Sequence, residues 1–265
     1  MKAALIRLHD TRFFGKILTI DDLVMLTERD EFVYHEMLTH IPLCSLLDPK
    51  RVLVIGGGDC GIVREVLRHP VEHVVQCEID ERVTAVCAEH FPWVKGVQSD
   101  PRCELVFDDG VTFMETHQGE FDLVIVDSTD PVGPAVGLFQ RAFYTKVGRA
   151  LRPGGVMVAQ TESPHWAASV VGGIYEELRH GFEHVHAYMG FIPTYPSGSW
   201  CWAYTSNDRR PVDFFDLERA AKISEGCRYY NPGIQAAAFV LPTFAEQAIR
   251  GENPFREFDQ RNREQ

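Results

Sequence analysis

The first 27 residues alternate between apolar and polar side chains, a period typical of β-strands whose two faces meet different surroundings. The alternation surrounds the segments FFGK and TIDD, and turn-forming residues stand at Gly15, Asp21 and Asp22. This pattern predicts two or three short antiparallel strands joined by tight turns. We therefore expect residues 1–27 to form a small N-terminal β-strand appendage.

Helical spacing replaces this alternation in the segment RDEFVYHEMLTHIPLCSLL. Asp30 precedes the helical pattern and is a typical N-cap residue, whereas Pro42 removes a backbone donor and is expected to interrupt the helix. The predicted helix leads into the main domain. The positions that share its spacing are Phe32, His35, Glu36, Leu38 and Thr39.

From Arg51 onward, short apolar runs alternate with amphipathic segments. The runs RVLVIGG, HVVQCEID, CELVFDDG and FDLVIVDSTD are each followed by a helical pattern, and Gly154 and Gly155 are expected to end the fourth helix. The next predicted elements are a strand at VMVAQ, a helix at HWAASVVGGIYEELRH and two late strands at HVHAYMGFI and SWCWAYTSN. The C-terminal tail FREFDQRNREQ is expected to fray. Such alternation predicts an α/β fold with a Rossmann-like parallel sheet flanked by helices, over residues 28–265.

Composition narrows the class of protein. The chain has 265 residues, enough for one main core with a small appendage, and its apolar runs are far shorter than the roughly 18 residues of a membrane span. The start MKAALIRLHD lacks the long apolar core of a signal peptide, so a cytoplasmic location is expected by default. Seven cysteines without a C-x-x-C pair favour free thiols over a zinc site or a disulfide framework.

The chain is acidic, with 38 Asp and Glu residues against 26 Lys and Arg residues and a formal net charge of −12. Nucleic-acid binding requires clustered basic residues, so such a partner is disfavoured. An acidic protein is better suited to a cationic ligand, although acidity often serves only solubility.

Carboxylates follow four of the predicted parallel strands, at the edge of the sheet where ligands bind in folds of this kind. Glu78 comes about 20 residues after the glycine turn, where nucleoside-binding folds usually carry a ribose-hydroxyl acceptor. The carboxylates at the four strand ends are Asp59, Glu78 with Asp80, Asp108 with Asp109, and Asp127 with Asp130.

The glycine turn GGGDCG contains an unexpected acid. Gly56, Gly58 and Gly61 match G-x-G-x-x-G, which alone is weak evidence for a dinucleotide site. Asp59 and the acidic strand ends would repel a pyrophosphate and attract a sulfonium nucleoside, such as a derivative of S-adenosylmethionine. Asp59 could equally cap the helix that begins near Gly61, and the residue alone does not decide between the two roles.

The segment DSTDP places Asp127 and Asp130 three residues apart on a loop that leaves a buried strand. Two carboxylates at that spacing can face one pocket, an arrangement suited to a diamine. The alternative is that Asp130 only shapes the turn before Pro131.

YHEMLTH differs from the H-E-x-x-H zinc motif because His35 and His40 are five residues apart and do not share a helix face, so no metal site is predicted. Tyr34 and His35 are either ordinary residues of that helix or polar groups aimed into the cleft. In IPTYPSG, Tyr195 stands between two prolines, where a rigid loop could hold its phenol over a pocket.

Together these segments resemble one family over nearly the whole chain. They are similar to the polyamine aminopropyltransferases, the spermidine synthase family. The segments that carry the similarity are TERDEFVYHEMLTH, VLVIGGGDCGIVREVLRHP, CEIDERV, DDG, DSTDPVGPA, IPTYPSG and CRYYNPGIQAAAFVLP. In that family, decarboxylated S-adenosylmethionine donates its aminopropyl group to an amine, usually putrescine, and spermidine and 5'-methylthioadenosine are formed. The donor is a co-substrate, and no further cofactor is expected.

The resemblance also implies roles for individual residues. Asp127 would be the base that accepts the proton of the attacking amine, and Tyr34 would help to hold that nitrogen. The other positions that match the family are Asp59 for the donor's aminopropyl ammonium, Glu78 for the ribose hydroxyls, Asp109 with Gly110 for the adenine amine, Asp130 and Tyr195 for the far end of the acceptor, His35 for the acceptor pocket, and Pro134 for the nucleoside.

Some positions depart from the family pattern. Relatives carry an additional N-terminal segment that covers the acceptor, and Ala3 and Ala4 stand here near an expected Gln, so the choice of acceptor is left open. Met25 occupies a site that often holds Gln. Cys60 replaces the usual glycine of the turn, and nothing in the sequence explains it.

The resulting prediction is a cytoplasmic aminopropyltransferase of polyamine biosynthesis that makes spermidine from putrescine, with Asp127 as base and a homodimer or homotetramer as its assembly. Rival enzymes are an aminopropyltransferase for cadaverine, agmatine or spermidine and an S-adenosylmethionine-dependent methyltransferase. Asp59 disfavours the methyltransferase because it would face the methionine carboxylate of that donor. A non-catalytic polyamine-binding protein would not need a base beside the donor.

Overall fold

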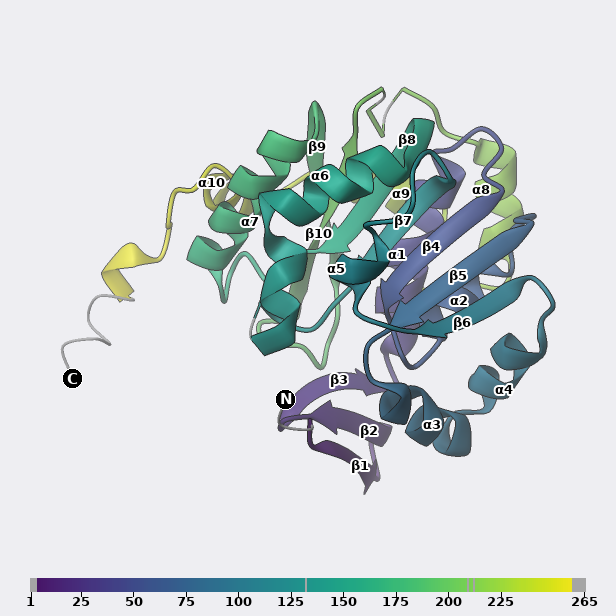
Figure 1. Ribbon diagram of the computed structural model, residues 1–265. Coiled ribbons are helices and arrows are strands. Elements are labelled where there is room, and N and C mark those ends of the chain that lie inside the picture. Colours follow the sequence, from purple (N-terminus) through teal and green to yellow (C-terminus); the bar gives the residue numbers. More distant parts are fainter. Residues whose placement is uncertain (1–3, 132, 209, 212, 259–265) are drawn as a thin grey trace.

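A seven-stranded sheet forms the centre of the protein, with helices on both of its faces (Figure 1). The computed structural model describes residues 4–131, 133–208, 210–211 and 213–258. The strand order is β6-β5-β4-β7-β8-β10-β9, in which the neighbours from β6 to β8 pair in parallel and β10 is antiparallel to both β8 and β9. The predicted Rossmann-like α/β fold is confirmed.

The parallel strands read as continuous apolar runs because both of their faces are covered. Val52 and Val54 of β4 pack into the hydrophobic cluster that includes α1, whereas Leu53 and Ile55 point to the opposite cluster. The strands of this sheet are β4 (Arg51–Gly56), β5 (His73–Glu78), β6 (Cys103–Phe107), β7 (Phe121–Asp127), β8 (Leu151–Gln160), β9 (His184–Phe191) and β10 (Ser199–Ser206).

The helices form two layers, one on each face of the sheet. Residues of α1 to α4, α8 and α9 pack into one cluster, and those of α5 to α7 and α10 pack into or against the other. Their bounds are α1 (Glu31–Cys44), α2 (Gly61–Val66), α3 (Glu81–His90), α4 (Pro92–Ser99), α5 (Gly110–Phe113), α6 (Arg141–Ala150), α7 (Ala168–Gly181), α8 (Leu217–Ser224), α9 (Pro232–Ala237) and α10 (Thr243–Ile249), with a 3₁₀ helix, η1, at Gly133–Phe139.

Three local predictions are wrong. Helix α1 continues through Pro42 to Cys44, because the proline lies in the last turn and removes few helical hydrogen bonds. Asp30 precedes α1 without a side-chain cap; its carboxylate instead accepts hydrogen bonds from Thr27 and Thr194. Gly154 and Gly155 lie inside β8, which begins directly after α6.

A second, antiparallel sheet consists of β1 (Ile6–Thr11), β2 (Gly15–Ile20) and β3 (Leu23–Thr27). Its β2–β3 turn uses Asp21 and Asp22 with φ of 49° and 68°, the left-handed conformations that two-residue hairpins favour. The predicted strands and turns are confirmed, while the division into domains 1–27 and 28–265 stays a prediction. In Figure 1 this sheet lies beside the ends of the central strands that carry the acidic residues.

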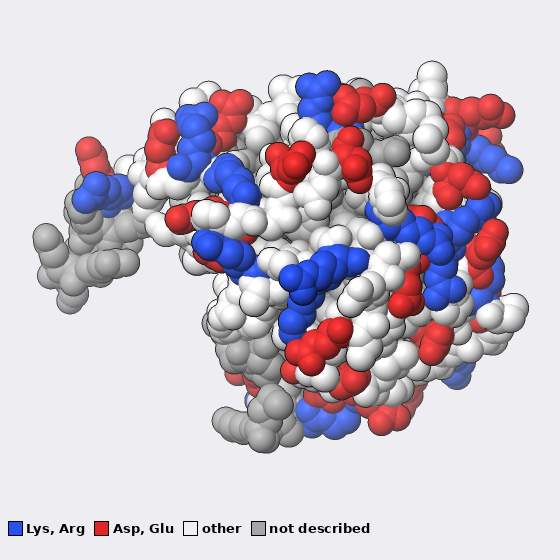
Figure 2. Space-filling model, turned by 45° about the horizontal axis from the view of Figure 1, so that its top comes forward, with Lys and Arg blue, Asp and Glu red and all other residues white. Residues whose placement is uncertain are grey.

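The surface carries charges of both signs. Acidic and basic side chains are interspersed over the face in Figure 2. None of the helices in the described part of the chain is long and apolar enough to cross a membrane. The last predicted feature, the frayed tail, falls partly on residues 259–265, outside the described residues.

Candidate active site

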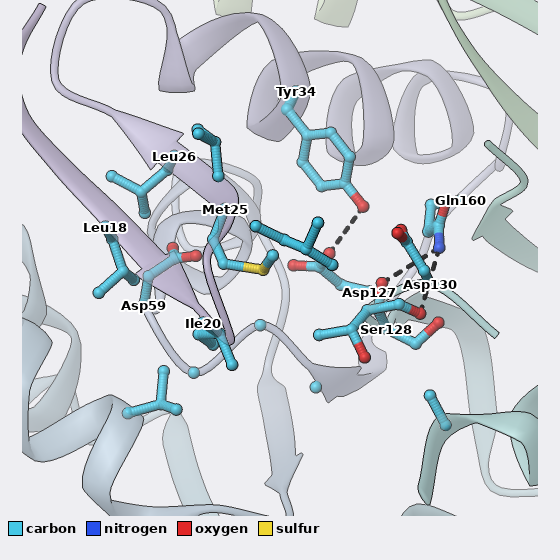
Figure 3. A pocket seen from close by; sticks show the side chains of 18 of the residues that line it. Leu18, Ile20, Met25, Leu26, Tyr34, Asp59, Asp127, Ser128, Asp130 and Gln160 are labelled. Atoms are coloured by element: carbon cyan, nitrogen blue, oxygen red, sulfur yellow. Dashed lines mark hydrogen bonds between the residues drawn. The ribbon is translucent and has the colours of Figure 1, made fainter. Parts of the chain in front are cut away.

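A cavity of about 1270 Å³ opens at the carboxyl ends of the parallel strands, where the chain order reverses between β4 and β7. This switch point is the usual ligand site of open α/β sheets. Residues of β2 and β3, including Leu18 and Met25, form the opposite wall (Figure 3). Nine of the predicted site residues line the cavity: Tyr34, His35, Asp59, Glu78, Asp109, Gly110, Asp127, Asp130 and Tyr195. The tenth, Pro134, lies in η1, and its side chain is outside the described structure.

The glycine turn after β4 passes directly over the end of β7. Gly56 has φ of 82°, and a β-carbon there would lie 2.0 Å from the carbonyl oxygen of Asp127. The amide of Gly57 donates to the same oxygen at 3.2 Å. Only glycine permits this approach, so the turn and the predicted base are held in contact.

Asp127 is the last residue of β7 and is partly buried. Its carboxylate accepts a hydrogen bond of 2.7 Å from the hydroxyl of Tyr34 on α1 (Figure 3). Burial and the negative charge of Asp59 raise the pKa of Asp127 to about 6, although the Tyr34 hydrogen bond and the charge of His35 act in the opposite direction. A carboxylate with a pKa close to neutral pH is well matched to general-base chemistry.

Asp59 is held by a chain of ion pairs that begins at the cavity wall. His35 Nε2 lies 3.3 Å from the Asp59 carboxylate, and His35 Nδ1 lies 2.6 Å from Glu31. Glu31 in turn pairs with Arg64 at 2.8 Å. Burial lowers the pKa of His35, but the charges of Asp59 and Glu31 outweigh burial and raise it to about 10. The imidazole is therefore a cation at neutral pH.

Asp59 lies both next to the start of α2 and at the cavity wall. Its Oδ1 atom accepts a hydrogen bond of 2.6 Å from the amide of Gly61, the first residue of α2, although the N-cap position itself is Cys60. The same side chain lines the cavity. His35 packs against Gly61 so closely that a β-carbon there would lie 2.2 Å from its ring. The hydrogen bond from Gly61 and the ion pair with His35 thus fix the Asp59 carboxylate at the cavity wall.

The second and third strands contribute the other predicted acids. Glu78 is 8% exposed, accepts a hydrogen bond from the amide of Asp80 at 2.8 Å, and has its pKa raised by burial to about 7. Asp109 caps α5 through a bond of 2.8 Å to the amide of Val111 and is exposed to the cavity. At Gly110 a β-carbon would lie 2.5 Å from Ile55, so the backbone approaches β4 closely.

Asp130 and Tyr195 come from the loops after β7 and β9 and also line the cavity. Asp130 lines the cavity directly before Pro131, so both roles considered for it fit its position. The hydroxyl of Tyr195 donates to the carbonyl of Met25 at 2.6 Å, which fixes the loop after β9 against β3. Its ring also packs edge-to-face on Tyr34, with centroids 6.0 Å apart.

Sequence reasoning missed three residues of this site. Glu31 is not among the predicted site residues, although it stands four residues before His35 on the predicted helix, a spacing at which side chains pair. Gln160, the last residue of β8, and Glu162, two residues later, also line the cavity. The rule that ligand groups follow parallel strands would have found them, since QTE directly follows VMVA.

No group of three or more potential metal ligands occurs among the described residues. The cavity instead gathers carboxylates around a partly apolar wall, which suits an organic cation.

Comparison with known proteins shows which family this chain is similar to. The model of the spermine/spermidine synthase domain matches residues 31–216. A polyamine aminopropyltransferase of Halorhodospira halophila is 47% identical over 241 residues, covering 89% of this chain and 86% of the relative. One from Thermoanaerobacter sp. (strain X514) is 44% identical over 238 residues, covering 89% of this chain and 85% of the relative.

Solved structures that resemble this chain are enzymes of the same family. A spermidine synthase in complex with the transition state analogue AdoDATO superposes with a TM-score of 0.91 at 36% identity, covering 94% of this chain and 86% of that chain. The spermidine synthase from Thermotoga maritima gives a TM-score of 0.89 at 36% identity, with coverages of 94% and 85%. The chain therefore belongs to the spermine/spermidine synthase family and is an aminopropyltransferase.

Proposed function

We propose that this aminopropyltransferase uses putrescine as its acceptor, decarboxylated S-adenosylmethionine as its donor and no further cofactor. The products would be spermidine and 5'-methylthioadenosine. The observation that carries the proposal is the hydrogen bond from Tyr34 to Asp127, which sets a carboxylate of raised pKa at the centre of an acidic cavity.

The chemistry requires a neutral amine, because a protonated nitrogen has no lone pair with which to attack carbon. In the proposed step Asp127 accepts a proton from the nitrogen held beside Tyr34, and that nitrogen attacks the carbon next to the sulfonium. The new C–N bond forms as the C–S bond breaks, and the bonding electrons neutralise the sulfur. The positive charge of the sulfonium thereby passes to the new secondary ammonium.

Asp59 supports the donor side of this proposal. Decarboxylated S-adenosylmethionine carries an ammonium but no carboxylate, so the fixed Asp59 carboxylate would attract its aminopropyl end. Glu78 is suited to accept hydrogen bonds from ribose hydroxyls, and Asp109 with Gly110 to contact adenine. An S-adenosylmethionine methyltransferase is disfavoured because its donor keeps a carboxylate that Asp59 would repel.

Cellular context adds two smaller proposals. The seven cysteines are free thiols, which is typical of a reducing compartment and supports a cytoplasmic location. The homodimer or homotetramer implied by the resemblance stays a prediction.

A panel of amines tests the acceptor. Purified protein is incubated with decarboxylated S-adenosylmethionine and putrescine, cadaverine, agmatine or spermidine, and the release of methylthioadenosine is measured. The proposal predicts the highest kcat/KM with putrescine. A higher value with a longer amine would reject putrescine as the acceptor, and no release with any amine would reject the transfer reaction.

A further inference from the structure

Arg64 lies at the outer end of the chain of ion pairs that reaches Asp59. It belongs to α2, and its guanidinium binds Glu31 of α1 through two nitrogens, Nη2 to Oε2 at 2.8 Å and Nη1 to Oε1 at 3.3 Å. The third nitrogen, Nε, donates to Glu65 Oε1 at 2.7 Å. Both carboxylates are buried, with side chains 8% and 6% exposed. Because all three nitrogens are engaged, the guanidinium has a fixed orientation.

Glu31 transmits this orientation to His35. The Glu31 Oε2 atom that binds Arg64 also lies 2.6 Å from His35 Nδ1, one helical turn further along α1. Burial raises the pKa of Glu31, but the hydrogen bonds and charges of His35 and Arg64 outweigh burial and lower it to about 2. Glu31 is therefore an anion between two cations, and it holds the His35 ring from its Nδ1 side.

A second contact holds the backbone of Asp59. The indole nitrogen of Trp93, in α4, donates to the Asp59 carbonyl at 2.8 Å. The Trp93 ring stacks on the buried ring of Phe91, with centroids 4.9 Å apart, and the Arg64 guanidinium lies over the same indole at 4.9 Å from its centroid. Arg64 and Trp93 thus support each other, and their contacts reach Asp59 at its carboxylate and at its carbonyl.

The contacts of the Asp59 carboxylate use one of its two oxygens. The Gly61 amide and His35 Nε2 both lie against Oδ1, at 2.6 and 3.3 Å. Oδ2 can therefore accept hydrogen bonds from a ligand in the cavity that Asp59 lines. The direction in which Oδ2 points depends on where His35 holds Oδ1.

We infer that Arg64 is a positioning residue that fixes the Asp59 carboxylate in the orientation needed to bind the donor's aminopropyl ammonium. Arg64 does not line the cavity, so it acts through Glu31 and His35. The inference rests on the proposed function, in which Asp59 meets that ammonium.

The charge of Arg64 and its positioning role have opposite effects on donor binding. A cation near the site repels a cationic donor, so its removal would strengthen donor binding if charge alone mattered. A positioning role predicts weaker binding instead, because the Asp59 carboxylate loses the support that fixes its orientation. The sign of the change in donor affinity therefore separates the two.

Arg64→Met tests this sign. The dissociation constants of decarboxylated S-adenosylmethionine and of methylthioadenosine are measured by calorimetry without an amine, so that no transfer takes place. Methylthioadenosine lacks the aminopropyl group and serves as the control ligand. For Arg64→Met we expect the Kd of the donor to rise about tenfold, as for a weakened charge-assisted contact, and the Kd of methylthioadenosine to stay within about twofold of wild type. The donor KM should rise by a similar factor, while kcat changes by less than about threefold.

Two further variants sharpen the comparison. Arg64→Lys keeps the charge but loses the fork of three nitrogens, so the Kd of the donor should rise about twofold to fivefold. Arg141→Met removes an exposed arginine of α6 whose guanidinium lies 3.7 Å from Glu177, and both dissociation constants should stay within about twofold of wild type. Unfolding temperatures show which variants are folded. If Arg64→Met does not fold, Arg64→Lys carries the test with the same expected direction.

The outcomes distinguish failure of the positioning role from failure of the proposed function. An unchanged or lower Kd of the donor in the folded variant overturns the role of Arg64, and so does an equal rise for the donor and methylthioadenosine. Either result leaves aminopropyl transfer by the wild type intact. A wild-type enzyme that binds the donor but releases no methylthioadenosine with any amine overturns the proposed function, and the donor affinities then still decide the role of Arg64.

Discussion

The hydroxyl of Tyr34 donates a hydrogen bond of 2.7 Å to the carboxylate of Asp127, 93 residues further along the chain. This contact joins the first long helix to the end of the central strand β7. It places a hydrogen-bond donor and a carboxylate of raised pKa on the same wall of the cavity.

The pH dependence of the reaction should reflect this contact. Because the pKa of Asp127 is about 6, kcat/KM for the acceptor should rise as the pH increases through 6 and the base loses its proton. Tyr34→Phe removes a hydrogen bond that stabilises the charged carboxylate of Asp127. The rise in kcat/KM should therefore move to higher pH in this variant. Initial rates between pH 5 and 9 measure the pH at which kcat/KM rises. If that pH is the same in wild type and Tyr34→Phe, the hydrogen bond does not tune the pKa of Asp127.

Close packing of Gly61 against His35 predicts a contrast between two glycine substitutions. A β-carbon at Gly61 would lie 2.2 Å from the His35 ring, so Gly61→Ala should displace His35 and Asp59 and destabilise the protein by about 2 kcal/mol. Gly173 of α7 is exposed, and a β-carbon added there would meet no atom within 4 Å, so Gly173→Ala should stabilise by about 0.5 to 1 kcal/mol. Denaturant unfolding compares the two, and equal effects would contradict the packing argument.

Glu36 anchors the segment after α8 to helix α1. Its buried carboxylate accepts hydrogen bonds from the amides of Arg228, Tyr229 and Tyr230 at 2.8, 2.8 and 2.7 Å. Glu36→Gln should lower the free energy of unfolding by about 2 to 3 kcal/mol because it replaces a charged acceptor. Glu89→Gln, on the exposed side of α3, is the matched control and should change it by less than about 0.5 kcal/mol. If the free energy of unfolding falls only slightly in both variants, the hydrogen bonds of Glu36 contribute little to stability.

Cys60 is the residue of the glycine turn that the sequence left unexplained. The structure shows a fully buried thiol on a backbone with φ of 61°, a conformation that favours glycine. Cys60→Gly relieves the backbone but removes the packed sulfur, so we expect stability within about 1 kcal/mol of wild type. Cys60→Val adds a branched side chain and should cost about 2 kcal/mol or more. Thermal unfolding measures both, and a stable valine variant would refute the role of backbone strain.

The sequence predicted the sheet and most of the site because both depend on local patterns. Apolar runs such as FDLVIVD require a strand covered on both faces, and a carboxylate after such a strand must reach the ligand edge. Asp59, Glu78 and Asp127 were found in this way.

What the sequence did not predict depends on contacts between distant segments. The ion pair of Glu31 with Arg64 requires α1 and α2 to lie side by side, which no periodicity shows, whereas Glu31 and His35 pair within one helix at a spacing of four residues. Pro42 was expected to interrupt the helix, but α1 ends two residues after it, so the proline removes few helical hydrogen bonds.

The most direct test of the central claim compares wild type with Asp127→Asn. Methylthioadenosine release from decarboxylated S-adenosylmethionine and putrescine is followed beside methylthioadenosine binding. With Asp127 as general base, the variant should lose a factor of about 100 or more in kcat and bind methylthioadenosine almost as tightly as wild type. A variant that retains its turnover, or that loses nucleoside affinity in proportion to activity, would contradict the account.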